Sequence, residues 1–466
     1  AQEVNCGCSV TQVQTNSVQS CDTIVGTVDT VRTVSEFWAA ISKANKSGNR
    51  TILIANGTYS MASTSKYPYI TGSNIVFRSL SGNRDSVIIT GQGMKDVAPK
   101  VEIGIYVVGD HITIADLTIK NVGNHAIATT GEHMLVHNVR IQNTFEQMIK
   151  GTSGADGSDS SIVQCSLFEY TAGIGPQFYI GGLDIHDGDY WNVRDNVFYD
   201  IESPSKAVAE HAVHFWNSSS HNIVERNVIV NCDRGIGFGL GSSRNDGGII
   251  RNNMIYNDGK GKYADVGIGL ETSPGTKVYN NTIHIEYQNA IEYRFAATKD
   301  VMISNNLSNK QIKLREGAQA SLAANYTTAQ SSWFVNPSKG NLRLNAAQTQ
   351  VVGKGLVLAE VKDDIDQKMR GASNDLGAHQ YGSVSIIPSG NDELVLYPNP
   401  ATTRIFMNGS FESIDRYRVY DLQGQTVLEG ENLQRNAPIN VDGLRPGLYY
   451  LQIPGKVFSF IALGSE

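Results

Sequence analysis

The feature that most constrains the fold is a short pattern that returns along most of the chain from about Gly109 onward. In each copy an aliphatic or β-branched residue, two variable residues and an Asn precede alternating apolar positions. The recurring column reads Asn138, Asn196, Asn227, Asn253, Asn281 and Asn306, with Cys165 taking one place. The step is roughly 25 to 31 residues, about one turn of a three-sided solenoid. Stacked Asn side chains at a tight turn bond backbone groups of neighbouring turns, which explains the column without a functional role.

The repeats predict an all-β chain, and specifically a right-handed parallel β-helix. The 46 glycines and the charged fraction of 18% suit a turn-rich β protein. No segment between the repeats reads as a long amphipathic helix, so a leucine-rich repeat or a β/α barrel fits less well. The net charge of -7 argues against a nucleic-acid binder. No apolar run approaches the length that spans a bilayer, and we expect a monomer.

The sequence predicts four regions. Residues 1–30 form an N-terminal arm with cysteines, and 31–382 form the β-helix behind a capping helix near 35–44. Residues 383–392, rich in Ser, Gly and Pro, form a linker, and 393–466 form a small β-sandwich of short strands separated by turns. The sequence opens without an initiator Met, so we expect a mature protein whose leader has been removed.

The cysteines predict one disulfide near the N-terminus. A bond from Cys21 to Cys6 or to Cys8 fits a secreted protein. A metal site built from the same three cysteines is the weaker alternative, because no His lies nearby. Cys165 and Cys232 lie in apolar runs and are expected to be buried small hydrophobic residues.

Aligning the copies by the Asn column places one short strand of each turn in register. Alternate residues of a strand point to opposite faces, so the outward residues form two columns. One column reads Ala128, Lys150, Asp184, His214, Gly237, Gly269, Glu292 and Lys313. The other reads Thr130, Thr152, His186, Trp216, Gly239, Glu271, Arg294 and Arg315. Adjacent parallel strands lie about 4.8 Å apart, so consecutive members of a column are neighbours.

A cluster of functional side chains follows from this alignment. Lys150, Asp184, His186, His214 and Trp216 come from three consecutive turns, within about 10 Å along the axis. A solvated face rarely concentrates these residue types beside turns that carry only Gly. The catalytic candidates are therefore His186, His214, Asp184, Lys150 and, further along, Arg294. The glycines beyond the cluster predict a bare floor on which a polymer could lie.

Other residues of the same face are candidates for contacts with a substrate or a metal. Loops at 171–181, 202–210 and 257–265 enter the same strands and could wall a groove. The candidate substrate-binding residues are Trp216, Glu271, Glu292, Lys313, Arg315, Tyr179 and Tyr263. Asp187 and Asp189 are candidate Ca²⁺ ligands, since Ca²⁺ takes several oxygen ligands, although such Asp-Gly pairs also suit turns.

Two stretches carry resemblances to known families. The helix at 35–44, the strand Thr51–Ala55 and the turn Asn56-Gly57 resemble the entry to parallel β-helix proteins of the pectate-lyase-like superfamily. The blocks at 394–401, 419–424 and 444–450 resemble the C-terminal sorting domain of the type IX secretion system of Bacteroidota. That resemblance implies export across the outer membrane by this machinery, followed by release or surface attachment.

The cluster and the fold resemblance together favour a polysaccharide lyase. Cleavage of a uronic-acid polymer by β-elimination needs a cation for the sugar carboxylate, a base for the C5 proton and an acid for the leaving oxygen. His214 or His186 would be the base, Lys150 or Arg294 would bind the carboxylate or protonate the leaving group, and Asp184 would orient a histidine. Ca²⁺ is a possible cofactor.

Two other functions remain open. Asp184-Ile185-His186 is similar to the DPH motif of β-helical mannuronan C5-epimerases, with Ile185 in place of Pro, whereas the Lys and Arg signature of alginate and chondroitin B lyases is not matched. An inverting glycoside hydrolase needs two carboxylates, but Asp184 and Glu271 are about 14 Å apart along the axis. A non-catalytic carbohydrate-binding β-helix would use Trp216 and the tyrosines alone.

Overall fold

The computed structural model divides the chain into two compact units, Ala1–Ser383 and Val384–Glu466. It describes residues 7–21, 23–62, 66–94, 102–152, 157–382, 395–397, 399–408, 413–421, 424–434, 437–453 and 456–463. The predicted linker at 383–392 and Cys6 lie outside these ranges. We describe each unit by itself.

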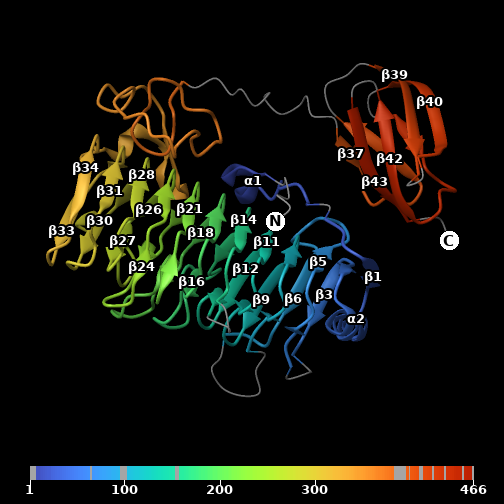
Figure 1. Cartoon of the computed structure of the whole chain (residues 1–466), viewed down its shortest axis with the longest axis horizontal. Coiled ribbons are helices and arrows are strands. Elements are labelled where there is room, and N and C mark those ends of the chain that lie inside the picture. Colours follow the sequence, from blue (N-terminus) through green and yellow to red (C-terminus); the bar gives the residue numbers. More distant parts are fainter. Residues whose placement is uncertain are drawn as a thin grey trace. The chain divides into compact units, whose positions relative to one another are not determined.

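The first unit is a parallel β-helix, as the repeats predict, with three sheets that run the length of the solenoid (Figure 1). Sheet 1 contains β1 (Thr27–Val31), β2 (Arg50–Ile54), β5 (Ile75–Ser79), β8 (Ile112–Ala115), β11 (Leu135–His137), β14 (Ile162–Gln164), β17 (Asn192–Arg194), β21 (Ile223–Glu225), β25 (Ile249–Arg251), β28 (Lys277–Tyr279), β31 (Val301–Ser304) and β34 (Ala320–Ala323). Sheet 2 contains β4 (Tyr69–Ile70), β7 (Ile105–Val107), β10 (Ile127–Thr129), β13 (Ile149–Gly151), β16 (Leu183–His186), β19 (His211–Trp216), β23 (Arg234–Phe238), β27 (Ile268–Glu271), β30 (Asn289–Arg294) and β33 (Gln311–Arg315). Sheet 3 contains β3 (Gly57–Ser60), β6 (Val87–Thr90), β9 (Thr118–Val122), β12 (Arg140–Thr144), β15 (Leu167–Glu169), β18 (Val197–Tyr199), β22 (Val228–Val230), β26 (Met254–Asn257), β29 (Thr282–Ile285) and β32 (Leu307–Ser308).

The interior of the solenoid is filled by the inward residues of these strands, chiefly Ile, Val, Leu and Phe. Helix α2 (Val34–Ser47) closes one end of it and buries Phe37 and Ile41 in the same apolar cluster. A capping box starts the helix, with Thr33 as the N-cap residue. Gly48 follows its last turn.

The Asn column is a continuous ladder of buried side chains. Each Nδ2 donates to the Oδ1 of the next turn, at 3.0 Å from Asn196 to Asn227 and 3.0 Å from Asn227 to Asn253. The ladder continues through Asn281 and Asn306 to Asn325. Two assignments are wrong by one position, because Asn138 and Cys165 belong to the preceding place in each turn, where the backbone has positive φ. Ser166 takes the ladder position that was assigned to Cys165, since its backbone N–H donates to Asn196.

The outer side of sheet 3 is covered by other parts of the same unit. The segment with helix α1 (Val10–Gln14) packs there, together with the extension that follows β34. The extension contains η1 (Ser331–Trp333), β35 (Phe334–Asn336), η2 (Pro337–Lys339) and β36 (Asn341–Leu344), and a short pair β20 (Ser219–Ser220) and β24 (Asn245–Asp246) joins two turns elsewhere. The α1 segment and the extension cover sheet 3 with apolar side chains, so sheet 3 has no open face at the turns beneath them.

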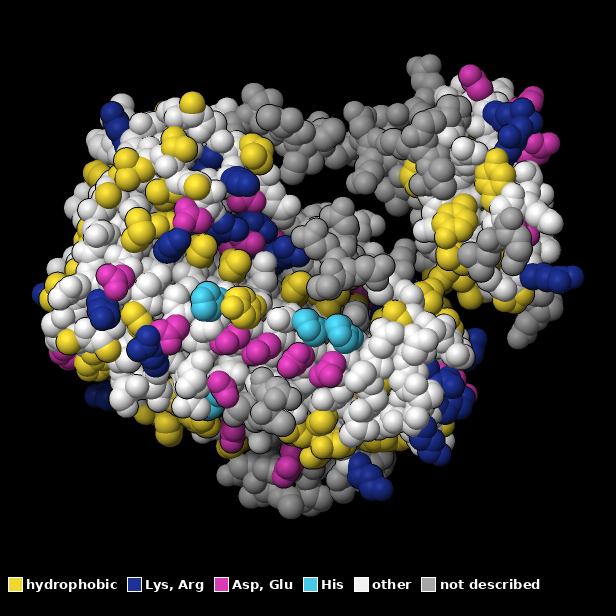
Figure 2. Space-filling model, in the orientation of Figure 1, with side chains coloured by type: hydrophobic (Ala, Val, Ile, Leu, Met, Phe, Trp, Pro, Cys, Tyr) yellow, Lys and Arg dark blue, Asp and Glu magenta, His cyan; other side chains and the backbone are white. Residues whose placement is uncertain are grey.

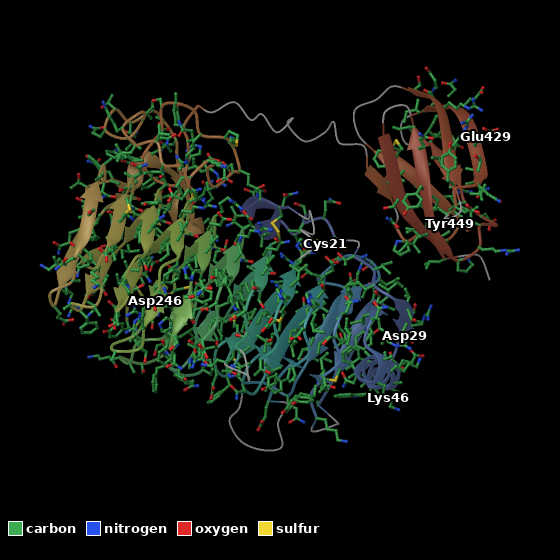
Figure 3. All side chains as sticks on the ribbon, in the orientation of Figure 1. Cys21, Asp29, Lys46, Asp246, Glu429 and Tyr449 are labelled. Carbon is green, nitrogen blue, oxygen red and sulfur yellow. A yellow bond between two sulfur atoms is a disulfide. The ribbon has the colours of Figure 1, made fainter. Side chains whose placement is uncertain are left out.

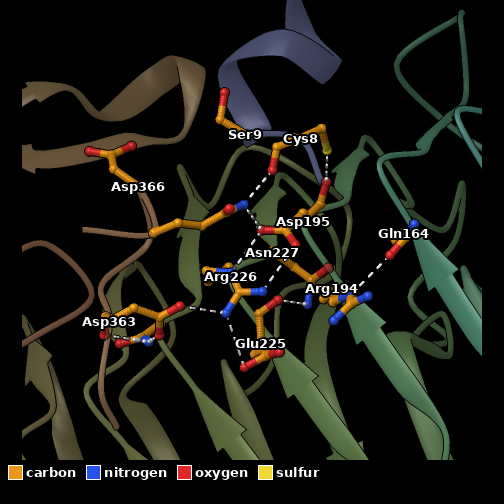
Figure 4. A network of polar contacts seen from close by, with 12 residues as sticks. Cys8, Ser9, Gln164, Arg194, Asp195, Glu225, Arg226, Asn227, Asp363 and Asp366 are labelled. Atoms are coloured by element: carbon orange, nitrogen blue, oxygen red, sulfur yellow. Dashed lines mark hydrogen bonds and ion pairs between the residues drawn. The ribbon is translucent and has the colours of Figure 1, made fainter. Parts of the chain in front are cut away.

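A disulfide and an ion-pair network fix this cover. Cys8 is bonded to Cys165, so the predictions of a free buried Cys165 and of a Cys21–Cys8 bond are wrong. Cys21 is also disulfide-bonded and lies in the N-terminal segment (Figure 3), and its pairing with Cys6 remains a prediction. Cys232 is buried and free, as expected. Arg226 joins the layers through Asp195 at 2.8 Å and Asp363 at 3.0 Å (Figure 4).

The second unit contains two antiparallel sheets around one apolar cluster that includes Ile405, Val419 and Leu451. One sheet has the order β37 (Val395–Tyr397), β38 (Arg404–Asn408), β41 (Pro438–Asn440). The other has the order β40 (Thr426–Gln434), β39 (Ser413–Tyr420), β42 (Gly447–Ile453), β43 (Lys456–Ala462).

Candidate functional site

The predicted register of sheet 2 is confirmed strand by strand. Lys150 pairs with Asp184, and Asp184 pairs with His214. His186 pairs with Trp216 in the second column. The same columns continue through Gly237, Gly269 and Glu292 to Lys313, and through Glu271 and Arg294 to Arg315. The cluster therefore lies on three adjacent strands, β13, β16 and β19.

Asp184 is the centre of the cluster. Its side chain is 2% exposed, and it accepts hydrogen bonds from Lys150 Nζ through Oδ2 and from Trp216 Nε1 through Oδ1, the latter at 2.7 Å. His186 Nε2 lies 3.4 Å from Oδ2 and 2.9 Å from Lys150 Nζ. Burial alone would raise the pKa of Asp184, but its contacts with His186, His214 and Lys150 lower it well below its usual range. The carboxylate therefore stays ionised and holds its partners in place.

The members of the cluster differ in their access to a substrate. The Lys150 and His186 side chains are 12% and 21% exposed, whereas His214 is fully buried. The ring of Trp216 stacks on His214 at 5.4 Å and meets His186 edge-on at 4.3 Å. Lys150 and His186 are thus the polar groups of the cluster that reach the outer face, and Trp216 and His214 brace them.

Sequence reasoning missed Glu210 and His211, which lie beside His214 at the start of β19. Glu210 Oε2 is 3.5 Å from His214 Nδ1, and the ring of His211 is 4.4 Å from that of His214. Burial and the neighbouring charges of His214 and Arg234 lower the pKa of His211 well below its ordinary value. The signal was present in the run Glu210-His211-Ala212-Val213-His214, but His211 lies between the predicted loop at 202–210 and the first outward residue, His214, so neither column includes it.

The loop before Glu210 is held by a buried acid. Asp233 Oδ2 accepts hydrogen bonds from the backbone N–H of Ser203 at 3.1 Å and of Ala209 at 2.9 Å. Burial raises the pKa of Asp233 to about 6, against the opposing effect of these two hydrogen bonds. Asp233 therefore fixes both ends of the loop from which Glu210 and His211 emerge.

The predicted glycine floor is only partly bare. A Cβ on Gly237 would lie 2.6 Å from Cε1 and Nε2 of His211, so the imidazole already occupies the space above this residue. Gly239 has φ of +75°, and a Cβ there would lie 1.7 Å from the backbone oxygen of Glu271. Gly239 is thus required by the backbone and is not an outward position.

The charged residues further along sheet 2 are paired with one another. Arg294 binds Glu316 at 2.7 Å and Glu271 at 3.2 Å, and Arg315 binds Glu292 at 2.8 Å. A pocket of about 260 Å³ lies here, and its lining includes His211, Arg234, Tyr263, Glu271, Glu292, Arg294 and Arg315. Lys313 is exposed and does not line it. Arg294 is thus three strands away from His214 and separate from the Asp184 cluster.

The remaining candidates lie around the cluster. Tyr179 is 39% exposed on its loop. Its partial burial, together with the charges of Asp184 and Glu210, raises its pKa. Asp187 has positive φ, and the backbone N–H of Asp189 donates to Asp159 at 2.8 Å. Both observations are typical of a turn, the alternative to a Ca²⁺ site at these residues. Within the described part of the chain, neither Asp belongs to a group of three possible metal ligands, and Ca²⁺ binding there remains a prediction.

Two aromatic residues of the same face were also missed. Tyr69 and Tyr106 occupy the first outward column before Ala128 and Lys150, and their rings lie 5.2 Å apart. Tyr69 is exposed. Both columns began at the turn of Ala128, which comes one turn after Tyr106 and two turns after Tyr69, so neither tyrosine was included.

Comparisons with known proteins agree with the fold of both units. Residues 395–459 match the family model described as a secretion system C-terminal sorting domain. Residues 158–350 match the model described as periplasmic copper-binding protein (NosD), a description that assigns no residue of this chain. No curated protein matches the chain.

Several solved structures are similar to the β-helix. Pectate lyase Pel9A aligns with a TM-score of 0.52 at 14% identity, over 73% of this chain and 90% of that one. A glycoside hydrolase aligns with a TM-score of 0.49 at 8% identity, over 66% and 98% of the two chains. An alginate lyase from Paenibacillus sp. aligns with a TM-score of 0.42 at 18% identity, over 65% and 99%. At these identities the likeness establishes the fold and no activity.

The first unit has a parallel β-helix fold, which it shares with pectate lyase Pel9A. The second unit contains a secretion system C-terminal sorting domain, so the protein is secreted or attached to the cell surface. No helix in the described part of the chain is long and apolar enough to cross a membrane. Acidic side chains and histidines gather over the middle turns of the face drawn in Figure 2.

Proposed function

We propose that the protein is a polysaccharide lyase that cleaves a uronic-acid polymer by β-elimination. The observation that carries the proposal is the pair Lys150 and His186, which lie side by side at 2.9 Å on the outer face above the ionised Asp184. A cation next to a base, on a rigid sheet, is what abstraction of a proton α to a carboxylate requires.

In this proposal Lys150 binds the carboxylate of the sugar and neutralises the charge that develops there. His186 Nε2 takes the C5 proton, the C5–H electron pair forms the C4=C5 double bond, and the C4–O bond breaks. The leaving oxygen takes a proton from Tyr179, whose raised pKa keeps the phenol protonated. A substrate carboxylate that attracts the Lys150 ammonium also frees the Nε2 lone pair of His186 for this step.

His214 is a positioning residue in this arrangement. Its side chain is fully buried behind Asp184 and Trp216, so it does not reach a sugar on the outer face. Tyr106 and Tyr69, two and three strands from Lys150 in the same column, would stack on sugar rings further along the polymer.

C5-epimerisation is the second candidate, because it begins with the same proton abstraction and the Asp184-Ile185-His186 geometry serves both. A hydrolase is less well supported, because Asp184 is locked by Lys150 and Trp216 and Glu271 is paired with Arg294. A binding-only β-helix would not need the Lys150–His186 pair.

The test is absorbance at 235 nm during incubation with alginate, pectate, glucuronan and chondroitin, with and without Ca²⁺. A rise that is lost in His186→Ala and in Lys150→Met, and kept in His221→Ala, supports the lyase. His221 is the matched control because it is exposed on a turn, where it stacks on Tyr190. Exchange of the C5 proton in D₂O without absorbance would move the assignment to an epimerase. New reducing ends without absorbance would indicate hydrolysis, and polymer binding with no product would indicate a binding module.

A further inference from the structure

A second constellation lies behind the Lys150–His186 pair. Glu210, His211 and His214 each offer one ligand atom, and these atoms lie within 4.8 Å of one another. Two of the three residues are in the core of the molecule, since His211 is 5% exposed and His214 is fully buried.

All three residues have a buried polar atom without a hydrogen-bond partner, namely Glu210 Oε2, His211 Nδ1 and His214 Nδ1. An unsatisfied buried donor or acceptor costs about 1–3 kcal/mol. Three such atoms on three neighbouring residues are therefore unusual in a native structure, where nearly all buried polar groups are paired.

The orientation of His214 shows what kind of partner is missing. Its Nε2 lies 3.2 Å from the backbone oxygen of Gly239, and a carbonyl oxygen only accepts, so Nε2 carries the proton. The other ring nitrogen, Nδ1, faces two carboxylate oxygens, Glu210 Oε2 at 3.5 Å and Asp184 Oδ1 at 3.6 Å. A cation placed between Nδ1 and these two oxygens would attract all three atoms.

The spacing suits a small divalent ion. Zinc is bound by His nitrogen and carboxylate oxygen at about 2.0–2.2 Å in tetrahedral geometry, which separates neighbouring ligand atoms by about 3.4 Å. The distances from His214 Nδ1 to Glu210 Oε2, 3.5 Å, and to Asp184 Oδ1, 3.6 Å, are close to this ligand–ligand separation and too long for good hydrogen bonds. We propose that Glu210, His211 and His214 bind a divalent transition-metal ion of the zinc class, with the fourth position left for water or Asp184.

The ligand types decide between classes of ion. Two imidazoles and one carboxylate favour zinc, cobalt or copper, whereas Ca²⁺ and Mg²⁺ prefer oxygen ligands alone. This site is distinct from the Ca²⁺ site predicted at Asp187 and Asp189.

The chain contains its own comparison. Asp364, Asp366 and His379 also bring three possible ligand atoms together. Here Asp364 accepts from two backbone N–H groups at 2.9 Å, Asp366 binds Arg343 at 2.9 Å, and His379 Nδ1 accepts from Leu344 N–H at 3.2 Å. Because these groups are already satisfied, we expect no ion at this second group.

The experiment is a titration of the full chain with Co²⁺ after removal of bound metal with a chelator. The expected result is one equivalent of cobalt with the visible absorption of a tetrahedral N/O site, displaced by Zn²⁺. His211→Ala and Glu210→Gln should each weaken binding by about 100-fold or more, and His379→Ala should leave it unchanged.

A thermal-shift measurement keeps the test decisive if a variant is less stable. Zn²⁺ should raise the Tm of the wild-type chain and of His379→Ala, and not that of His211→Ala, because only a native-state site stabilises by mass action. The absence of a cobalt spectrum, or equal binding by His211→Ala and the wild type, overturns the proposal. None of these readouts uses polymer cleavage, so the outcome is independent of the proposed lyase activity.

Discussion

Substitution of Asp184 by Asn tests the arrangement of the cluster most directly. Asn keeps an acceptor for the Trp216 N–H, which now lies 2.7 Å from Oδ1, but removes the negative charge that Lys150 and His186 share. The Lys150 ammonium is 12% exposed, so it loses its counter-ion in a place where water reaches it poorly. Removal of one partner of a buried ion pair costs about 3–5 kcal/mol. We expect the free energy of unfolding to fall by that amount.

The double variant Lys150→Met with Asp184→Asn separates stability from function. Replacement of both partners leaves no uncompensated charge, and such replacements are often neutral, so the double variant should unfold within about 1 kcal/mol of the wild type. Its lyase activity should nevertheless be absent, because the cation for the sugar carboxylate is gone. Urea unfolding followed by circular dichroism, in EDTA so that metal binding plays no part, measures both free energies. A double variant as unstable as Asp184→Asn alone would refute this account of the ion pair.

Three further outcomes are expected. Tyr106→Ala removes the ring contact with Tyr69 and should raise KM for the polymer by about 2- to 10-fold at unchanged kcat, and a fall in kcat would contradict a purely binding role. Loss of the Cys8–Cys165 bond in Cys165→Ser opens a loop with a sequence separation of 157 and should cost about 5 kcal/mol in urea unfolding, and a cost below about 1 kcal/mol would show that the ion-pair network holds the cover alone. Burial raises the pKa of Asp233 from 3.8 to about 6 in the folded state. The protonated carboxyl therefore stabilises the folded state fully below pH 3.8, and this stabilisation is lost as the pH rises through 6. Asp233→Asn should therefore flatten the decline of the unfolding midpoint between pH 4 and about 7, and an unchanged slope would assign that decline to another group.

The sequence predicted the arrangement along sheet 2 well. In a parallel solenoid each turn contributes one strand, so a period of two within the strand and one Asn per turn determine which residues become neighbours. That is why Lys150, Asp184 and His214 were aligned correctly without coordinates. The alignment of Asn138 was off by one position because two adjacent places in each turn, one at positive φ and one in the ladder, both accept Asn.

Contacts that leave the repeat were not predictable in the same way. Cys8 and Cys165 are joined because the N-terminal segment crosses sheet 3, and no periodicity reports such a crossing. His211 was missed for a related reason, since its ring lies over Gly237 from the first residue of β19, outside the alternating pattern that the repeat predicts. Which histidine reaches solvent depends on packing around Trp216, and only the structure distinguishes the partly exposed His186 from the buried His214.

Because each turn contributes one strand, the outward residues of sheet 2 repeat at a fixed spacing along any polymer that lies on this face. A chain that lies along the axis meets a new pair of outward residues every 4.8 Å or so. Each sugar position would then be read by its own turn: tyrosines at one end, the Lys150–His186 pair in the middle, and the arginine pocket at the other end. A substitution in one turn would alter recognition of one sugar while the Asn ladder keeps the remaining turns in register, so the preference for a polymer could change one position at a time.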